Sequence, residues 1–201
     1  MGRPKTFDED AVLDRAIELF WTTGYHAVSV RDLEEGTGVL KGSLYAAFGD
    51  KRALFLASLR RYADNSAREI RELLAHGKDA RAGLEHYLRV RGKDCTGPTR
   101  GRGCLLANTA AEVAPHDLEV RAVVGESFEK LATTLAPTLR EAQEQGLISR
   151  RHDARELAAH LVVLVQGMTV VGKTEPDSAL IRSSLRFALS MLEPDTPEKS
   201  R

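Results

Sequence analysis

The sequence predicts an all-α fold, and three observations support this prediction. Apolar residues recur at spacings of three and four along most of the 201 residues, as in helices with one buried face. Charged residues make up 29% of the chain and aromatic residues only 5%, which is typical of helical soluble proteins. Glycines, prolines and N-cap aspartates separate the periodic stretches, so we expect nine helices.

The first helix is expected at 8–23, because Gly24 follows its last periodic residue. Its apolar face consists of Val12, Ala16, Leu19 and Phe20. A short basic arm precedes this helix. Arg3 and Lys5 in that arm are expected either to belong to an unstructured terminus or to contact phosphates or the minor groove of DNA.

The segment 29–51 predicts a helix, a tight glycine turn and a second short helix. Ser29 is a good N-cap, and Asp32 favours the positive end of the helix dipole three positions later. Gly36 and Gly38 accept the left-handed backbone that ends a helix and turns the chain. This layout is that of a helix-turn-helix reader of DNA.

The second helix of this segment is expected to begin at Lys41 and to close at Phe48. Leu44 and Phe48 are four positions apart and point at the core, and Leu40 offers no capping side chain before them. The outward residues are Lys41, Gly42, Ser43 and Tyr45. Bases outnumber acids from 37 to 62, so a compact phosphate footprint is expected on a chain whose net charge is zero.

Residues 7–56 resemble the DNA-binding domain of the TetR/AcrR family of bacterial one-component regulators. The matching residues are Ala16, Leu19, Phe20, Gly24, Tyr25, Val30, Leu33, Gly38, Val39, Lys41, Gly42, Ser43, Leu44, Tyr45, Phe48, Lys51 and Leu54. Two positions depart from the family pattern: Leu40 replaces a small or polar capping residue, and Ala47 replaces a ring.

The resemblance implies a TetR-like fold and a role in binding double-stranded, palindromic operator DNA. Among the expected contacts, Ser29, Tyr45 and Lys51 hold phosphates, whereas Lys41, Gly42 and Ser43 meet base edges or nearby backbone. The full set of expected DNA-binding residues is Arg3, Lys5, Ser29, Val30, Lys41, Gly42, Ser43, Tyr45 and Lys51.

Six further helices are expected at 51–76, 79–91, 104–114, 117–146, 153–172 and 177–192. A loop is expected at 95–103, and Pro137 is expected to kink the longest helix. We therefore divide the chain into a helix-turn-helix domain at 1–50, a regulatory and dimerisation domain at 51–193 and a disordered polar tail at 194–201.

The helix at 153–172 is apolar almost all round, and one globular face cannot bury so much apolar surface. It is either the central helix of a monomer or, as we favour, part of a homodimeric four-helix bundle with the helix at 177–192. The expected interface residues are Leu161, Leu164, Val165, Met168, Leu185 and Leu189.

A row of polar side chains marks a candidate ligand or sensor pocket. Cys104, Asn108 and Glu112 are spaced by four, so they share one helix face. The thiol stands at a helix start near Arg100 and Arg102, where helix amides and cations favour the thiolate.

The segment GCLLAN, followed by a glutamate, resembles the ligand-domain motif of a TetR branch that includes electrophile- and oxidant-responsive repressors. The resemblance implies a responsive cysteine at position 104 and a partner lysine, Lys173. Three alternatives stay open: an inert core cysteine, a plain small-molecule pocket, which we favour, and a Cys95–Cys104 disulfide.

The leading hypothesis is a ligand-responsive transcriptional regulator that a small molecule releases from its operator. No signal sequence and no apolar run of about 18 residues is apparent, so we expect a cytoplasmic protein without a membrane span. The six histidines lack metal-site spacing, and no cofactor is expected. A thiol enzyme using Cys104, or a helical scaffold that no longer binds DNA, are the other hypotheses.

Overall fold

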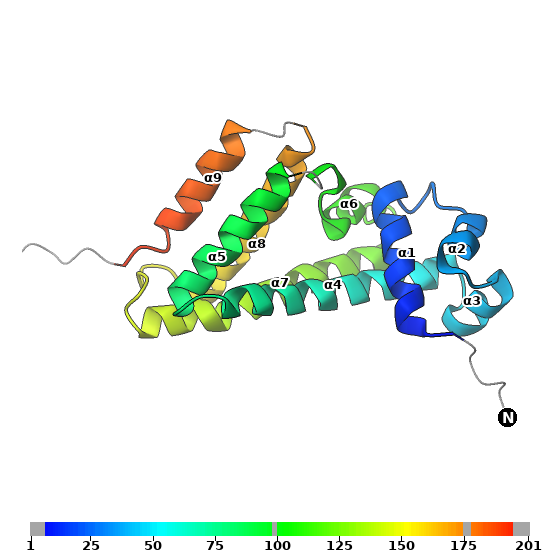
Figure 1. Ribbon diagram of the computed structural model, residues 1–201, viewed down its shortest axis with the longest axis horizontal. Helices are drawn as coiled ribbons and strands as arrows, with labels where there is room; N and C mark the ends of the chain where they lie inside the picture. The colour runs from blue at the N-terminus through cyan, green and yellow to red at the C-terminus, as the bar shows by residue number, and fades with distance from the viewer. Residues whose placement is uncertain (1–6, 98–99, 175–177, 195–201) are drawn as a thin grey trace, which may run out of the picture. The chain divides into compact units, whose positions relative to one another are not determined.

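The computed structural model describes residues 7–97, 100–174 and 178–194, and within them the predicted all-α fold is confirmed (Figure 1). The described helices are α1 (Glu9–Thr23), α2 (Val30–Thr37), α3 (Lys41–Phe48), α4 (Lys51–Ala75), α5 (Ala80–Thr96), the short 3-10 helix η1 (Arg100–Arg102), α6 (Leu105–Glu112), α7 (Leu118–Glu144), α8 (Ala154–Gly172) and α9 (Ala179–Ser190).

The chain forms two compact units. Unit 1 comprises residues 1–65 and 104–127, and unit 2 comprises residues 66–103 and 128–201. The units cut across the division expected at residues 50 and 51, because α6 and the starts of α4 and α7 pack with α1–α3. Unit 1 therefore combines the helix-turn-helix segment with the helix that carries the candidate sensor row.

Aromatic rings form the centre of unit 1. The ring of Phe55 lies edge-on to Phe20 at 4.9 Å between centroids and 4.5 Å from the ring of Tyr25. Leu33 and Leu44 are fully buried beside them, one from each helix of the predicted motif. The apolar spacing that predicted the motif is thus what attaches α2 and α3 to α1 and α4.

Helix starts follow the predicted caps. The carboxylates of Asp8 and Asp153 accept backbone N–H bonds from the first turns of α1 and α8, and Asp79 does so for α5. Asp50 accepts from the Ala53 amide at 2.7 Å in the first turn of α4. These bonds satisfy amides that a helix cannot satisfy itself.

The largest difference from the expected elements is at the end of α5. The helix continues to Thr96 rather than ending at 91, so Cys95 is a buried helical residue and not the start of a loop. Part of the expected loop forms η1, and α7 continues through Pro137. The expected helix start at Asp177 and the tail beyond Pro194 lie outside the described residues.

In unit 2, α5 packs against both α8 and α9 (Figure 1). The approach of α5 to α8 is close at Gly172, where an added Cβ would lie 2.2 Å from the carbonyl oxygen of Cys95. A side chain at position 172 would collide with the backbone of α5, so glycine permits this close contact. The apolar residues that the extended helix buries include Leu84, Tyr87 and Leu88.

One helix in the described part of the chain, α8, is long and apolar enough to span a membrane by length and composition alone, and 39% of its apolar window is buried. Central helices of soluble proteins have the same composition. Its buried residues include Leu161, Val165 and Met168, which belong to the core of unit 2. On the other side of the helix, the large apolar side chains of Val163 and Val170 are exposed.

Replacing Gly172 by alanine is expected to lower the free energy of unfolding by about 1–3 kcal/mol, because the new methyl group meets a backbone oxygen that cannot turn away. Gly125→Ala is the control: no atom lies within 4 Å of a Cβ at that helical position. This variant should gain up to about 1 kcal/mol from helix propensity. Urea unfolding of both variants measures the difference, and a Gly172→Ala protein as stable as the wild type would contradict the close packing of α5 on α8.

Candidate functional site

The segment predicted to read DNA forms a well-capped helix-turn-helix. Ser29 and Asp32 form a reciprocal capping box at the start of α2, as their spacing predicted. Gly38 ends α2 in the left-handed conformation with φ of 72°. Arg15 of α1 donates to the carbonyl of Thr37 at 2.7 Å and so ties the end of α2 to α1.

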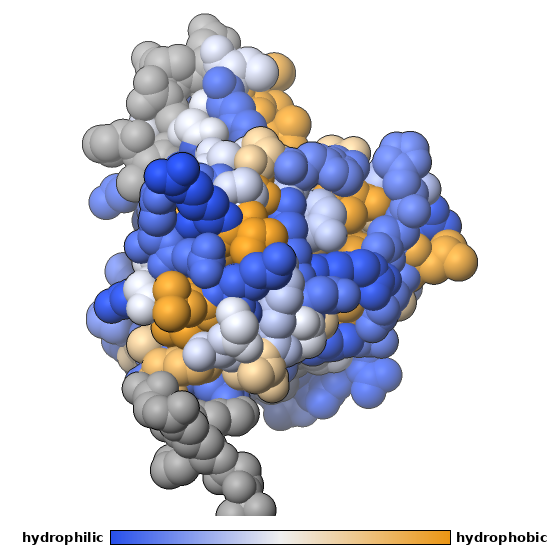
Figure 2. Space-filling model, turned by 90° about the vertical axis from the view of Figure 1, so that its right-hand side faces the viewer, coloured by the Kyte–Doolittle hydropathy of each residue, from blue (hydrophilic) through white to orange (hydrophobic). Residues whose placement is uncertain are grey.

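The start of α3 presents an uninterrupted exposed run, residues 40–43. No heavy atom lies within 4 Å of a Cβ built on Gly42, so this side of the helix is open to an approaching molecule. Tyr45 is half-buried, and the Lys41 ammonium lies 5.7 Å from the centre of its ring. In Figure 2, apolar side chains form small separate patches within a mainly hydrophilic surface.

Leu40 is the N-cap of α3 and makes no side-chain capping bond, as its chemistry requires. A carboxylate oxygen of Glu34, on α2, accepts the backbone N–H of Lys41 in its place. The cap that the sequence appeared to lack therefore comes from the preceding helix. The sequence did not indicate Glu34 as the cap, because caps are expected at the helix start. Glu34 lies seven residues before Lys41, on the preceding helix.

Lys51 has a different environment from the exposed phosphate contact that was expected. Its ammonium lies 4.7 Å from the centre of the Tyr25 ring, and the side chain is half-buried. Burial lowers the pKa of Lys51, while the nearby carboxylates of Glu112 and Asp32 act in the opposite direction. The ring and the carboxylates thus hold the ammonium in place at the start of α4.

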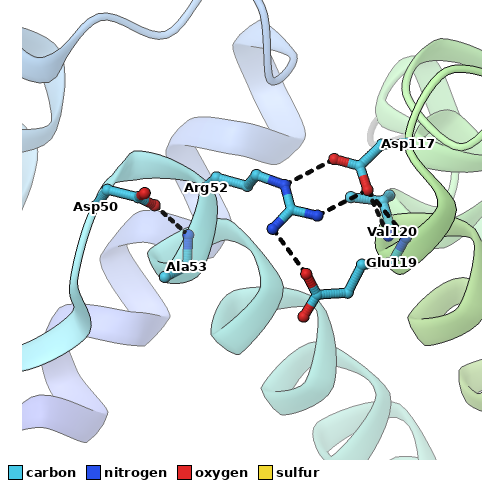
Figure 3. A network of polar contacts seen from close by, with 6 residues as sticks. All are labelled: Asp50, Arg52, Ala53, Asp117, Glu119 and Val120. Atoms are coloured by element: carbon cyan, nitrogen blue, oxygen red, sulfur yellow. Dashed lines mark hydrogen bonds and ion pairs between the residues drawn. The ribbon is translucent and has the colours of Figure 1, made fainter.

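Arg52 joins the start of α4 to the start of α7 (Figure 3). Its guanidinium donates to both oxygens of Asp117, at 2.7 and 2.8 Å, and to Glu119 at 2.7 Å. The hydrogen bonds from Arg52 hold the pKa of Asp117 well below its usual range, and the Val120 amide adds to the effect.

Two more basic residues of the range 37–62 have different roles. Arg61 pairs with Asp14 and Asp10, whereas Arg60 is exposed.

Glu112 also serves unit 1 internally. Its two carboxylate oxygens accept the backbone N–H groups of Tyr25, at 3.4 Å, and His26, at 3.0 Å. A Cβ on Gly24 would lie 3.2 Å from the same carboxylate. The carboxylate thus binds the turn between α1 and α2, and a place for Glu112 in a ligand pocket stays a prediction.

Cys104 is the N-cap of α6 and is buried, and its sulfur is not in a disulfide. The Tyr62 hydroxyl donates to its sulfur at 3.7 Å, and the Tyr62 ring lies edge-on to Trp21 at 5.1 Å. Asn108 is half-buried one turn further along α6. Lys173, the C-cap of α8, is exposed and belongs to unit 2.

Three of the six predicted interface residues lie elsewhere than expected. Leu161, Val165 and Met168 are buried in the core of their own chain. Leu164, Leu185 and Leu189 are half-buried. The large apolar side chains that α8 and α9 leave exposed are Val163, Val170, Leu180 and Phe187.

Two predicted residues and one class of site remain. Arg3 and Lys5 lie outside the described residues. Among the residues that the structure describes, no group of three or more histidine, cysteine, aspartate or glutamate side chains is placed to hold a metal ion.

Two family models match the chain. The model described as bacterial regulatory proteins of the tetR family matches residues 12–58, and the model of the tetracyclin repressor-like C-terminal domain matches residues 80–188. The chain belongs to the tetR family. The first match covers α2 and α3 with their supporting helices, and the family consists of transcriptional regulators rather than enzymes.

Relatives of this TetR-family chain agree with the assignment. It is 34% identical to the HTH-type transcriptional repressor ComR of Escherichia coli, over 84% of this chain and 81% of ComR. It is 26% identical to the HTH-type transcriptional repressor DhaR of Mycobacterium sp., over 92% of each. A solved structure of the TetR family regulator CifR, a cysteine mutant complexed with 26bp double-strand operator DNA, superimposes with a TM-score of 0.77 at 29% identity, covering 94% of this chain and 98% of that one.

Removal of the Glu34 carboxylate is expected to loosen α3. Glu34→Ala should cost about 1 kcal/mol of stability, the typical value of a lost cap, and should speed amide exchange at Lys41. Adding Leu40→Ser to this variant should restore part of the stability, because the hydroxyl can cap α3 directly. Urea unfolding and hydrogen exchange measure both effects. Glu35→Ala, on the same helix, is the control; equal losses from both variants would refute the assigned cap.

Proposed function

We propose that the protein is a transcriptional repressor that binds palindromic operator DNA as a homodimer in the cytoplasm and leaves it when a small molecule binds. The observation that carries the proposal is the exposed run 40–43 at the start of α3, held by a buried helix-turn-helix core. The second helix of such a motif lies in the major groove with its first residues against the base edges.

The structure supports separate roles for the residues on this surface. Lys41, Gly42 and Ser43 are exposed and reach base edges or the adjacent backbone. Tyr45 lies one helical turn from Lys41 and holds a phosphate together with the exposed Ser29 end of α2, beside Val30. Lys51 contributes a positive charge from beside Tyr25 rather than a freely extended contact. Arg3 and Lys5 remain candidates for phosphate or minor-groove contacts.

A homodimer accounts for the apolar surface of unit 2. Val163 and Val170 are separated by two turns on α8, and Leu180 and Phe187 are separated in the same way on α9. Each pair thus defines one outward stripe of its helix. A two-fold axis would pack the two stripes of one subunit on those of the other as a four-helix bundle, with the half-buried Leu164, Leu185 and Leu189 at its edges.

The named relatives point the same way. ComR and DhaR are repressors by name, and CifR was solved on double-strand operator DNA. Two reading heads related by a two-fold axis meet half-sites in successive major grooves, about 34–36 Å apart.

The response to an inducer is proposed to pass through α6. Cys104 begins this helix and Glu112 ends it, where the carboxylate binds the turn between α1 and α2. A ligand that favours a displaced α6 would pull on Tyr25 and His26 and so change the position of the reading head. The effect is a shift between two populations of the dimer, one of which fits the operator.

A second candidate trigger is modification of Cys104 by an electrophile or oxidant. The observation that favours it is the contact between its sulfur and the Tyr62 hydroxyl, because an added group must displace Tyr62 from that place. Tyr62 also contacts Trp21 of α1, so the displacement would reach the reading head. Asn108, in unit 1, and Lys173, in unit 2, stay predictions of the sequence.

Footprinting on the DNA beside its own gene tests the proposed function. The protein should protect two half-sites in successive major grooves, about 34–36 Å apart. Phe187→Glu should yield monomers by analytical ultracentrifugation and weaken operator binding more than tenfold, because each head alone makes half the contacts. Leu118→Glu, at an exposed leucine in unit 1, is the control and should stay dimeric. Tight operator binding by a monomeric Phe187→Glu protein would exclude the dimer.

The thiol trigger is tested in a Cys95→Ser background, where Cys104 is the remaining cysteine. Addition of N-ethylmaleimide should change the fluorescence of Trp21, the single tryptophan, and weaken operator binding about tenfold or more. A Cys104→Ser protein should show neither change. If the stoichiometric adduct forms and operator binding stays the same, Cys104 is not the trigger, and the small-molecule proposal is unaffected.

A further inference from the structure

We propose that Leu40 reads a thymine in the operator through contact with the C5-methyl group of that base. Leu40 is then a specificity-determining residue, in addition to the polar residues at 41–43. The inference rests on the proposed function, in which the start of α3 enters a major groove.

The Leu40 side chain neither packs in the core nor caps a helix. It is 75% exposed, although leucine gains free energy from burial. It cannot cap α3, because it has no acceptor atom, and Glu34 accepts the Lys41 amide. Because an acceptor on α2 caps the Lys41 amide, position 40 does not need a capping side chain. A residue that contacts DNA can stand there instead.

The place of Leu40 is suited to contact with a base. It is the N-cap of α3, directly before the exposed Lys41 and Gly42, and the first residues of a recognition helix are those that touch base edges. The open surface at Gly42 leaves space for the DNA to approach this end of the helix. Val39, the preceding residue, is half-buried and fixes the chain on the inner side.

The chemistry of leucine selects the base. Its side chain has no hydrogen-bond donor or acceptor, so contact with the polar edge of guanine, cytosine or adenine would leave that edge without water or a partner. The one apolar group in the major groove is the C5-methyl of thymine. A Leu40 side chain packed on this methyl group removes apolar surface of both molecules from water.

A single exposed leucine is ordinary in a protein surface, so position must distinguish Leu40 from the others. Leu118 is equally exposed, at 78%, and lies in the same unit. It stands between Asp117 and Glu119, which pair with Arg52, whereas Leu40 stands at the start of α3 and is followed by the exposed Lys41. Leu118 is therefore the matched control.

Replacement of thymine by deoxyuridine tests the inference, because it removes the C5-methyl group alone. The probe is the duplex that the wild-type protein selects from randomised DNA, with deoxyuridine placed at one thymine pair of symmetric positions at a time. At one such pair we expect binding to weaken about fourfold per half-site, the factor for one methyl group. Leu40→Ala should bind both duplexes equally, and Leu118→Ala should behave as the wild type.

The outcomes separate this inference from the proposed function. A wild-type protein that binds its selected duplex but is insensitive to every deoxyuridine overturns the role of Leu40 alone. Equal sensitivity in Leu40→Ala and wild type overturns it as well. Failure to select any duplex overturns the proposed function. Leu40→Ser provides a second variant whose α3 has its own cap, so a loss of methyl sensitivity in it cannot result from unfolding.

Discussion

The chain turns between α1 and α2 at Tyr25 and His26. The backbone N–H groups of these two residues donate to a carboxylate on a helix that is distant in the sequence. Glu112 is 86 residues from His26 in the sequence, at the end of α6. Because buried or partly buried amides are costly to leave unpaired, the geometry of this turn depends on α6 being in place. The reading head is thus completed by the segment that carries the candidate sensor thiol, and the two cannot be treated as independent domains.

The ion pairs of unit 1 extend the same arrangement. Arg52 binds Asp117 and Glu119, and Arg61 binds Asp14 and Asp10, so two of the basic residues between 37 and 62 hold helices together. The positive surface left for phosphate contacts is therefore small. Because one chain has few basic residues for phosphate contacts, binding by two linked chains matters for affinity. Two linked helix-turn-helix segments bind DNA more tightly than one, without any new contact within each segment.

Local signals were sufficient to predict the helices but not their partners. Ser29 and Asp32 predicted the start of α2, because caps act within a few residues. The apolar spacing also indicated the inward side of each helix, where Leu33 of α2 and Leu44 of α3 are buried. The contact of Glu112 with the turn between α1 and α2 could not be predicted. Its spacing from Cys104 shows that the two residues share one face of a helix, but not which element packs against that face. The burial of three expected interface residues in their own chain could not be predicted for a related reason. Apolar residues cover α8 almost completely, and only the packing of α5 shows that Leu161 faces inward.

The start of α3 shows how such distant contacts alter the meaning of a local pattern. In sequence, Leu40 is a missing cap and a weakness of the recognition helix. In the structure, Glu34 supplies the cap, and its negative charge lies at the positive end of the α3 dipole, where it is stabilised. The same bond holds the carboxylate on the Lys41 amide, so the acid has a defined partner close to the surface proposed to meet DNA. An apolar residue at the N-cap of α3 is therefore compatible with a capped helix, because the acceptor for the Lys41 amide comes from α2.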